Sequence, residues 1–385
     1  MPIPSRWRLL DYDTDAVIAE CDDIDGLFTD RVFPVQPVYE RYTLLGCTPE
    51  GSLRAAVDGT GPAWLGNIYL QGAHASCSGL ANCRTCYETG EELLDVRVVG
   101  HTEAADGLLD VELEGHRRDE PNNRNGTVAP AVSGYRLQVW PAPDGSDGLL
   151  PAGDCRDVAG VFHERPDLWP PGPPLALLGC RAVPTGLLNA KLAHVRVDGT
   201  AHVLHHWVFG DVVATRPSAL GDDLVDVELD ARLDSPLSAN ERPLYDMWRA
   251  GGPAAPNQWA GLERSDRYLW VGAAQAHRIH APDKPAGTVY HLDGRHVTDY
   301  DAFYCAIGEA INGPGGWFGG DGFWLHECAV GDAGATPGFR LVWHDAEVAR
   351  AHLVPGYDRK AWREAITFDR LVSWLTNDGA EVELR

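Results

Sequence analysis

The sequence repeats itself in order, and an internal repeat constrains a fold more than any single motif does. Three motifs occur twice: CDDIDGLF (21–28) and CRDVAGVF (155–162), LLGC (44–47) and LLGC (177–180), and LLDVELE (108–114) and LVDVELD (224–230). The offsets between copies are 134, 133 and 116 residues, so the order is kept, and the first copy has an insertion between its second and third motifs. This arrangement predicts a tandem duplication.

Each copy alternates apolar and polar residues with a period of two, as in Val195-Arg196-Val197. Such alternation is typical of half-buried strands, and turns rich in Gly, Pro and Asp separate them here. A strand-like leader precedes the first motif in each copy, RWRLLDY (6–12) and YRLQVW (135–140). We expect a multidomain chain with two β-rich tandem modules, residues 1–134 and 135–265, followed by a linker over 266–284.

From about residue 285 the pattern changes to alternating strands and helices. Strands are predicted at 288–294, 339–345 and 380–385, and helices at about 298–312, 321–330, 346–352 and 367–377. Thr298 with Asp301 three residues later predicts a capping box, and Gly313-Pro314 ends that helix. The order β-α-α-β-α-α-β predicts a small three-stranded parallel sheet covered by helices in residues 285–385.

This last segment resembles the barstar family, the intracellular inhibitors of secreted bacterial ribonucleases. The matching features are YHLDG (290–294), the turn and helix WFGGDGFWLHEC (317–328), LVWHD (341–345) and NDGAEVELR (377–385). The resemblance covers about 100 of the 385 residues and implies a parallel sheet with helices. It also implies a binding protein rather than an enzyme, an inhibitor or immunity protein that plugs a nuclease active site.

The resemblance places the inhibitory surface on the Gly-rich turn and the helix that follows it. The partner-binding candidates are Trp317, Phe318, Asp321, Phe323, His326 and Glu327. Spacing i, i+3, i+4 puts Phe323, His326 and Glu327 on one helix face, with Trp324, Leu325 and Cys328 turned toward the core. A cationic nuclease cleft suits carboxylates on such a face. Asp321 has a second interpretation as a helix cap.

Two positions depart from the family pattern. Glu327 falls on the most important inhibitory carboxylate of the family, but Phe323 and Trp374 stand where further acidic residues are expected. Either the partner differs from the usual target or inhibition has been lost. The alternatives are therefore a non-inhibitory interaction scaffold, or an enzyme whose site lies in the repeats. No P-loop, G-x-S-x-G or HExxH motif supports the enzyme.

Charge points to the same kind of partner. The chain has 32 Lys and Arg against 56 Asp and Glu, a formal net charge of −24. That balance argues against binding nucleic acid and favours a basic protein, such as a nuclease toxin. No apolar run approaches the roughly 18 residues of a membrane span, and the amino end has no apolar segment of a signal peptide. We expect a cytoplasmic bacterial protein without membrane contact.

Nine cysteines suggest buried thiols or metal ligands in a reducing compartment. His74, Cys77, Cys83 and Cys86 follow an H-x2-C-x5-C-x2-C spacing that could hold a structural zinc ion, with Cys47 as the alternative fourth ligand. No cofactor is required by this interpretation, and a reduced loop without metal is equally favoured. Cys21, Cys155, Cys47 and Cys180 recur between the copies and are better explained as buried small hydrophobic residues.

Overall fold

The computed structural model describes residues 5–30, 37–73, 90–104, 106–118, 132–140, 149–163, 172–233, 237–279 and 282–385. These residues form two compact units that are not contiguous in the sequence. Unit 1 comprises residues 1–33, 170–354 and 366–385, and unit 2 comprises residues 34–169 and 355–365. None of the described helices is both long and apolar enough to cross a bilayer.

Unit 2 is built on a seven-stranded antiparallel sheet, here called sheet I, in the order β10-β9-β6-β7-β8-β5-β11. Its strands are β5 (Glu40–Pro49), β6 (Ala63–Ala73), β7 (Glu91–Glu103), β8 (Leu109–Arg117), β9 (Gly134–Trp140), β10 (Leu150–Cys155) and β11 (Asp157–Ala159). Strand β10 also pairs with β5, so the sheet closes on itself around an apolar core. Helix α1 (Gly51–Asp58) adds Leu53 and Val57 to that core.

Unit 1 contains a second antiparallel sheet of seven strands, sheet II, in the order β2-β1-β13-β14-β15-β12-β3. Its strands are β1 (Trp7–Asp11), β2 (Val17–Cys21), β3 (Asp23–Asp25), β12 (Ala176–Cys180), β13 (Leu187–Val195), β14 (Ala201–Pro217) and β15 (Val225–Arg232). A short parallel pair, β4 (Phe28–Thr29) with β16 (Leu237–Ser238), follows it. Period-two alternation buries one face of these strands, including Trp7 and Leu9 of β1.

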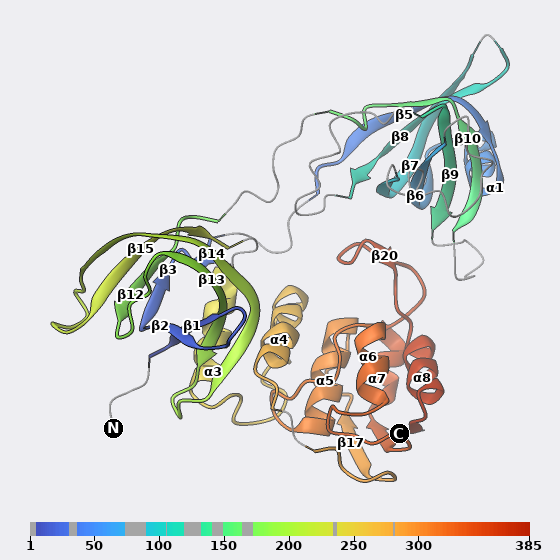
Figure 1. Cartoon of the computed structure of the whole chain (residues 1–385). Helices are drawn as coiled ribbons and strands as arrows, with labels where there is room; N and C mark the ends of the chain where they lie inside the picture. Colours follow the sequence, from blue (N-terminus) through green and yellow to red (C-terminus); the bar gives the residue numbers. More distant parts are fainter. Residues whose placement is uncertain are drawn as a thin grey trace. The chain divides into compact units, whose positions relative to one another are not determined.

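The two sheets have the same strand order, but each takes its strands from both halves of the chain. Strands β1 and β3, from the first copy of the motifs, pair with β13 and β12 of the second copy, and β2 pairs with β1. Strands β9–β11, from the second copy, pair with β6 and β5 of the first. Figure 1 shows blue strands among the green and olive ones of sheet II, and green strands among the blue ones of sheet I. Strand pairing therefore crosses the boundary that the motif offsets predict between residues 134 and 135.

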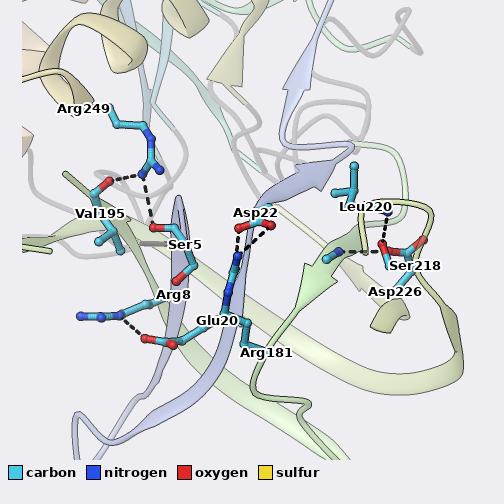
Figure 2. Close-up of polar contacts among 11 residues, drawn as sticks. Ser5, Arg8, Glu20, Asp22, Arg181, Val195, Ser218, Leu220, Asp226 and Arg249 are labelled. Carbon is cyan, nitrogen blue, oxygen red and sulfur yellow. Dashed lines mark hydrogen bonds and ion pairs between the residues drawn. The ribbon is translucent and has the colours of Figure 1, made fainter. Parts of the chain in front are cut away.

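The three repeated motifs meet at one junction in each sheet. In sheet I, the Gly46 amide donates to the Asp110 carboxylate over 2.8 Å, and the Cys47 and Cys155 thiols hydrogen-bond. The equivalent junction of sheet II, part of which is drawn in Figure 2, has Gly179 donating to Asp226 over 3.0 Å. There the thiols of Cys21 and Cys180 form the pair. The four cysteines are buried, as predicted, because each pair packs inside one of the two junctions.

Both junction glycines require a left-handed backbone. Their φ angles are +61° at Gly46 and +66° at Gly179, and the strand register shifts at each of them. This bulge carries the following cysteine toward its partner strand. In Figure 2 the Arg181 guanidinium, next along the chain, binds the Asp22 carboxylate of the first motif. The three motifs therefore recur in the sequence because the same junction, with its Gly–Asp hydrogen bond, occurs in both sheets.

The carboxyl-terminal part has the predicted three-stranded parallel sheet, sheet III, in the order β17-β18-β21. Its elements are β17 (Val289–Asp293), α5 (Tyr300–Asn312), α6 (Gly322–Ala329), β18 (Arg340–His344), α7 (Ala346–His352), α8 (Phe368–Asn377) and β21 (Glu381–Leu384). Helix α5 is capped by the Asp299 carboxylate, which accepts the Ala302 amide at 2.8 Å, and not by Thr298. The predicted β-α-α-β-α-α-β order is confirmed for the strands and helices of this part.

The linker predicted over 266–284 is instead largely helical. Helix α4 (Arg264–Ala276) occupies most of it, and α3 (Arg242–Arg249) precedes α4 after a 3₁₀ turn (Ala239–Glu241). Trp259 and Trp270 are buried in the core that sheet III and its helices form. The apolar contacts of α4 explain the difference, because a segment that buries tryptophan cannot act as a solvated linker. The C-terminal core therefore starts well before residue 285.

A second feature absent from the predicted order is a β-hairpin between α7 and α8. It consists of β19 (Tyr357–Asp358) and β20 (Arg363–Glu364), which pair antiparallel. Although it is inserted in the chain between two helices of unit 1, this hairpin belongs to unit 2.

Candidate partner-binding site

The Gly-rich turn at 313–320 packs tightly on the end of α5. Asn312 fastens it, since its Nδ2 donates to the carbonyl oxygens of Trp317 and Ala333 over 2.8 and 2.9 Å. A Cβ atom at Gly308 would lie 2.2 Å from the Gly316 carbonyl oxygen, so only glycine permits this approach. The backbone of the turn is thereby held against the helix, and its aromatic side chains point inward.

This packing contradicts the prediction for the first two candidate residues. Trp317 is 7% exposed and Phe318 is fully buried, so neither is an aromatic anchor on the surface. Phe318 packs edge-on against Phe339 inside the core. The Arg278 guanidinium lies 5.2 Å from the Trp317 ring centroid, a cation–π contact that covers the indole. The close approach of glycine backbones draws both rings into the interior.

Asp321 directly precedes helix α6, and its carboxylate accepts the Trp324 amide at 2.8 Å. Asp321 therefore acts as a helix cap, the second of its two interpretations. Phe323 is 64% exposed, as predicted. Trp324 is 42% exposed although it was predicted to face the core, because the side of α6 that is buried consists of Leu325, Cys328 and Ala329. The two aromatic rings lie edge to face, 5.5 Å apart.

The polar side chains of α6 differ in how they are held. His326 Nδ1 lies 2.7 Å from Asp378 Oδ1, and that hydrogen bond raises the pKa of His326 above its ordinary value. Glu327 is exposed, and within the described part of the chain its carboxylate has no hydrogen-bond or ion-pair partner. An unpaired carboxylate on a surface is available to a cationic partner. Phe323, Trp324 and Glu327 are called the α6 face below.

Helix α8 completes the surroundings of α6. Trp374 packs against the start of α6, since a Cβ at Gly322 would lie 3.0 Å from its ring. Trp374 therefore has a packing role where the family pattern expects an acid. Asp378, at the end of α8, does supply a carboxylate beside α6 through its contact with His326. Sequence reasoning missed Asp378, because its contact with His326, 52 residues away in the sequence, depends on how α6 and α8 pack.

A cavity of about 500 Å³ adjoins the α6 face in unit 1. Trp324 and Glu327 of the α6 face line it, together with Trp317, Trp248 and Arg278. A pocket of this size with aromatic walls and a few polar groups can receive side chains of a bound partner. The exposed face and the cavity are therefore continuous.

The zinc prediction concerns residues that lie mostly outside the described ranges. His74, Cys77, Cys83 and Cys86 all fall within 74–89, which the structure does not describe. Cys47, the alternative ligand, is buried in β5, and its thiol is hydrogen-bonded to that of Cys155. Serving as a ligand would require Cys47 to leave that pairing.

Comparison with known proteins adds no relative. No protein-family model matches the chain, and neither a curated protein nor a solved structure matches it.

Proposed function

We propose that this protein binds and inhibits a basic nuclease through the α6 face, as a barstar-like inhibitor or immunity protein. The observation that carries the proposal is the unpaired, exposed Glu327 carboxylate next to two exposed aromatic rings. Large aromatic side chains dominate interface energies, and a carboxylate complements the cationic cleft of a nuclease. The net charge of −24 favours encounter with such a partner.

The proposal includes a barstar-like C-terminal fold. In its support, the parallel order β17-β18-β21, with helices α5 and α6 before β18 and α7 and α8 after it, agrees with what the resemblance implies. We also propose that sheets I and II arose by tandem duplication with exchange of their leading strands. Equal strand order and the equivalent Gly–Asp junctions support this origin.

The test is a ribonuclease assay on the product of the neighbouring gene, in the presence and absence of the full chain. Glu327→Gln removes the charge and keeps the shape of the side chain. We expect it to weaken binding by roughly 30-fold, because a cationic group of the nuclease is left buried and unpaired. Glu347→Gln, on the exposed surface of α7, is the matched control and should leave inhibition unchanged.

Two outcomes would overturn the proposal. Unchanged inhibition by Glu327→Gln and by Phe323→Ser would place recognition elsewhere on the chain. Binding without any loss of nuclease activity would favour a non-inhibitory interaction scaffold instead. The observation that supports the scaffold is that Phe323 and Trp374 stand where the barstar family has acidic residues.

We further propose that His74, Cys77, Cys83 and Cys86 hold a structural zinc ion. The Cys-x2-Cys spacing supports this, because one turn brings both thiolates to a single ion. Elemental analysis of protein purified without added metal should give one zinc per chain. A content well below that contradicts the site.

A further inference from the structure

The inserted hairpin β19–β20 is held on sheet I by an arginine. Arg359 donates from Nε and Nη2 to the two carboxylate oxygens of Asp95 over 2.9 and 3.0 Å. Asp95 is only 3% exposed. A bidentate pair with a buried carboxylate is specific for a guanidinium group, since the planar fork matches both oxygens at once.

The backbone of β7 and two further side chains hold the Asp95 carboxylate in place. Asp95 has a φ of +49° in the middle of β7, where the pairing with β8 shifts register. A left-handed backbone at a residue other than glycine is strained, and such strain collects at functional sites. Trp64 Nε1 and Tyr39 Oη also donate to the carboxylate, over 2.7 and 2.8 Å. The carboxylate is therefore positioned by sheet I and its neighbouring loop, independently of the hairpin.

A second buried residue contacts the rest of the hairpin. Asn67, 1% exposed, donates from Nδ2 to the Trp362 carbonyl oxygen over 2.9 Å. Its Oδ1 accepts the Tyr357 hydroxyl at 2.6 Å. The Tyr357 ring lies 5.2 Å from Trp64, and the Trp362 ring lies 4.3 Å from His116, both edge to face. The site thus contacts one arginine and two aromatic residues.

The hairpin has little stability of its own. Each of its strands has two residues, and an isolated two-stranded hairpin is at best marginal in water. Trp362 adopts a φ of +52°, which adds strain. The Arg359 side chain stays 53% exposed even when docked. The order of the hairpin therefore depends on the site, and local opening would release it.

Release of the hairpin would leave the Asp95 carboxylate of sheet I without the cationic partner that Arg359 supplies. Burial raises the pKa of Asp95, but hydrogen bonds from Arg359, Tyr39 and Trp64 outweigh it and hold that pKa below its ordinary value. An ionised buried carboxylate that loses its partner is strongly destabilising. A cavity of about 310 Å³, lined by Tyr39, Arg97 and Glu114, adjoins the pair and gives room for an incoming side chain.

We infer that Asp95 and Asn67 form a recognition site on sheet I for an arginine-bearing peptide segment, which the chain's own hairpin occupies as an intramolecular ligand. The ligand class is a short segment with a guanidinium group flanked by aromatic side chains. The site lies in unit 2 and is independent of the α6 face.

The experiment uses the full chain and a variant in which residues 357–364 are replaced by a Gly/Ser linker of equal length. The probe is a fluorescent peptide with the sequence of residues 355–365. We expect the linker variant to bind the peptide at least tenfold more tightly than the wild type, whose site is filled. Adding Asp95→Asn to the linker variant should weaken binding by roughly 30-fold.

A matched peptide with Arg359→Lys is the control for guanidinium recognition, because lysine cannot form the bidentate pair. It should bind the linker variant much more weakly than the native peptide does. In the wild type, amide exchange at 356–365 should be slow, and Asp95→Asn should accelerate it. Circular dichroism establishes that each variant is folded.

Three outcomes would overturn the inference. Equal peptide binding by the wild type and the linker variant would show that the hairpin does not fill the site. If the folded linker variant does not bind the peptide, Asp95 and Asn67 do not form a recognition site. Equal affinity for the arginine and lysine peptides would contradict guanidinium recognition.

Discussion

Two buried histidines in unit 1 share a hydrogen bond that fixes both of their tautomers. His194 Nδ1 and His277 Nε2 are 2.8 Å apart, and neither side chain is more than 3% exposed. His277 Nδ1 donates to the Ala273 carbonyl oxygen at 2.7 Å, so His277 Nε2 must accept from His194. Burial lowers the pKa of His194 to about 2 and that of His277 to about 4.

Unit 1 should therefore lose stability in acid. The unfolded chain protonates both imidazoles near their ordinary pKa of about 6.5, whereas the folded chain keeps them neutral. Stability is full above that pH and falls as the pH drops, by about 1.4 kcal/mol per pH unit for each histidine that stays neutral. Below the folded pKa of His277, about 4, only His194 continues to contribute. Urea unfolding monitored between pH 7.5 and 4.5 measures this slope.

A variant isolates the contribution of the pair. His277→Gln cannot be protonated and should reduce the pH slope of stability by about one proton. His352→Gln, on the exposed end of α7, is the control and should leave the slope unchanged. A slope that is equal in the wild type and in His277→Gln would contradict the assignment.

At the scale of single elements, the Gly–Asp junctions hold the strands of sheets I and II in register. The Asp226 carboxylate accepts the Gly179 amide and a bond from Ser218, and these contacts lower its pKa. Asp226→Ala leaves a buried backbone amide without an acceptor, which costs about 1–3 kcal/mol. Asp110→Ala should cost a similar amount in sheet I. Thermal unfolding of the two variants, compared with the exposed substitution Asp369→Ala, tests the equivalence of the junctions.

The exchange of leading strands makes a prediction that distinguishes it from two contiguous modules. Leu9 in β1 and Leu137 in β9 are fully buried at matching positions. Leu9→Ala should cost about 2–5 kcal/mol and should accelerate amide exchange in β12–β15, while β5–β8 stay protected. Leu137→Ala should do the opposite. Acceleration in β5–β8 by Leu9→Ala would contradict the exchanged pairing.

Strand positions and the parallel C-terminal sheet could be predicted from the sequence, because alternation and helical spacing are local properties. The exchange could not, since the leaders at 6–12 and 135–140 have the same pattern and fit the strands of either copy. Helical spacing correctly predicts that Phe323 is exposed on α6, but it does not reveal that Trp324 is exposed as well. The exposure of Trp324 depends on which side of α6 packs into the core, and Leu325, Cys328 and Ala329 lie on that side.

Across the whole molecule, residues far apart in sequence form sites that no local pattern signals. Arg359 and Asp95 are 264 residues apart, and Asn67 and Tyr357 are 290 apart. Neither partner belongs to a recognisable motif. The hairpin also interrupts a run of predicted elements without changing their order, so the sequence pattern of the C-terminal part gives no sign of it.

The extent of the C-terminal core supplies the last prediction. Trp259 and Trp270 lie before residue 285 but are buried in that core, and each contributes about 4 kcal/mol or more by area removed from water. Arg267 pairs with Asp299 over 2.6 Å and continues the same interface. A fragment of residues 237–385 should therefore unfold cooperatively, whereas residues 285–385 alone should melt at lower temperature with an exposed apolar surface. Calorimetry and dye binding on the two fragments measure the difference, and equal cooperativity would show that α3 and α4 are dispensable for the fold.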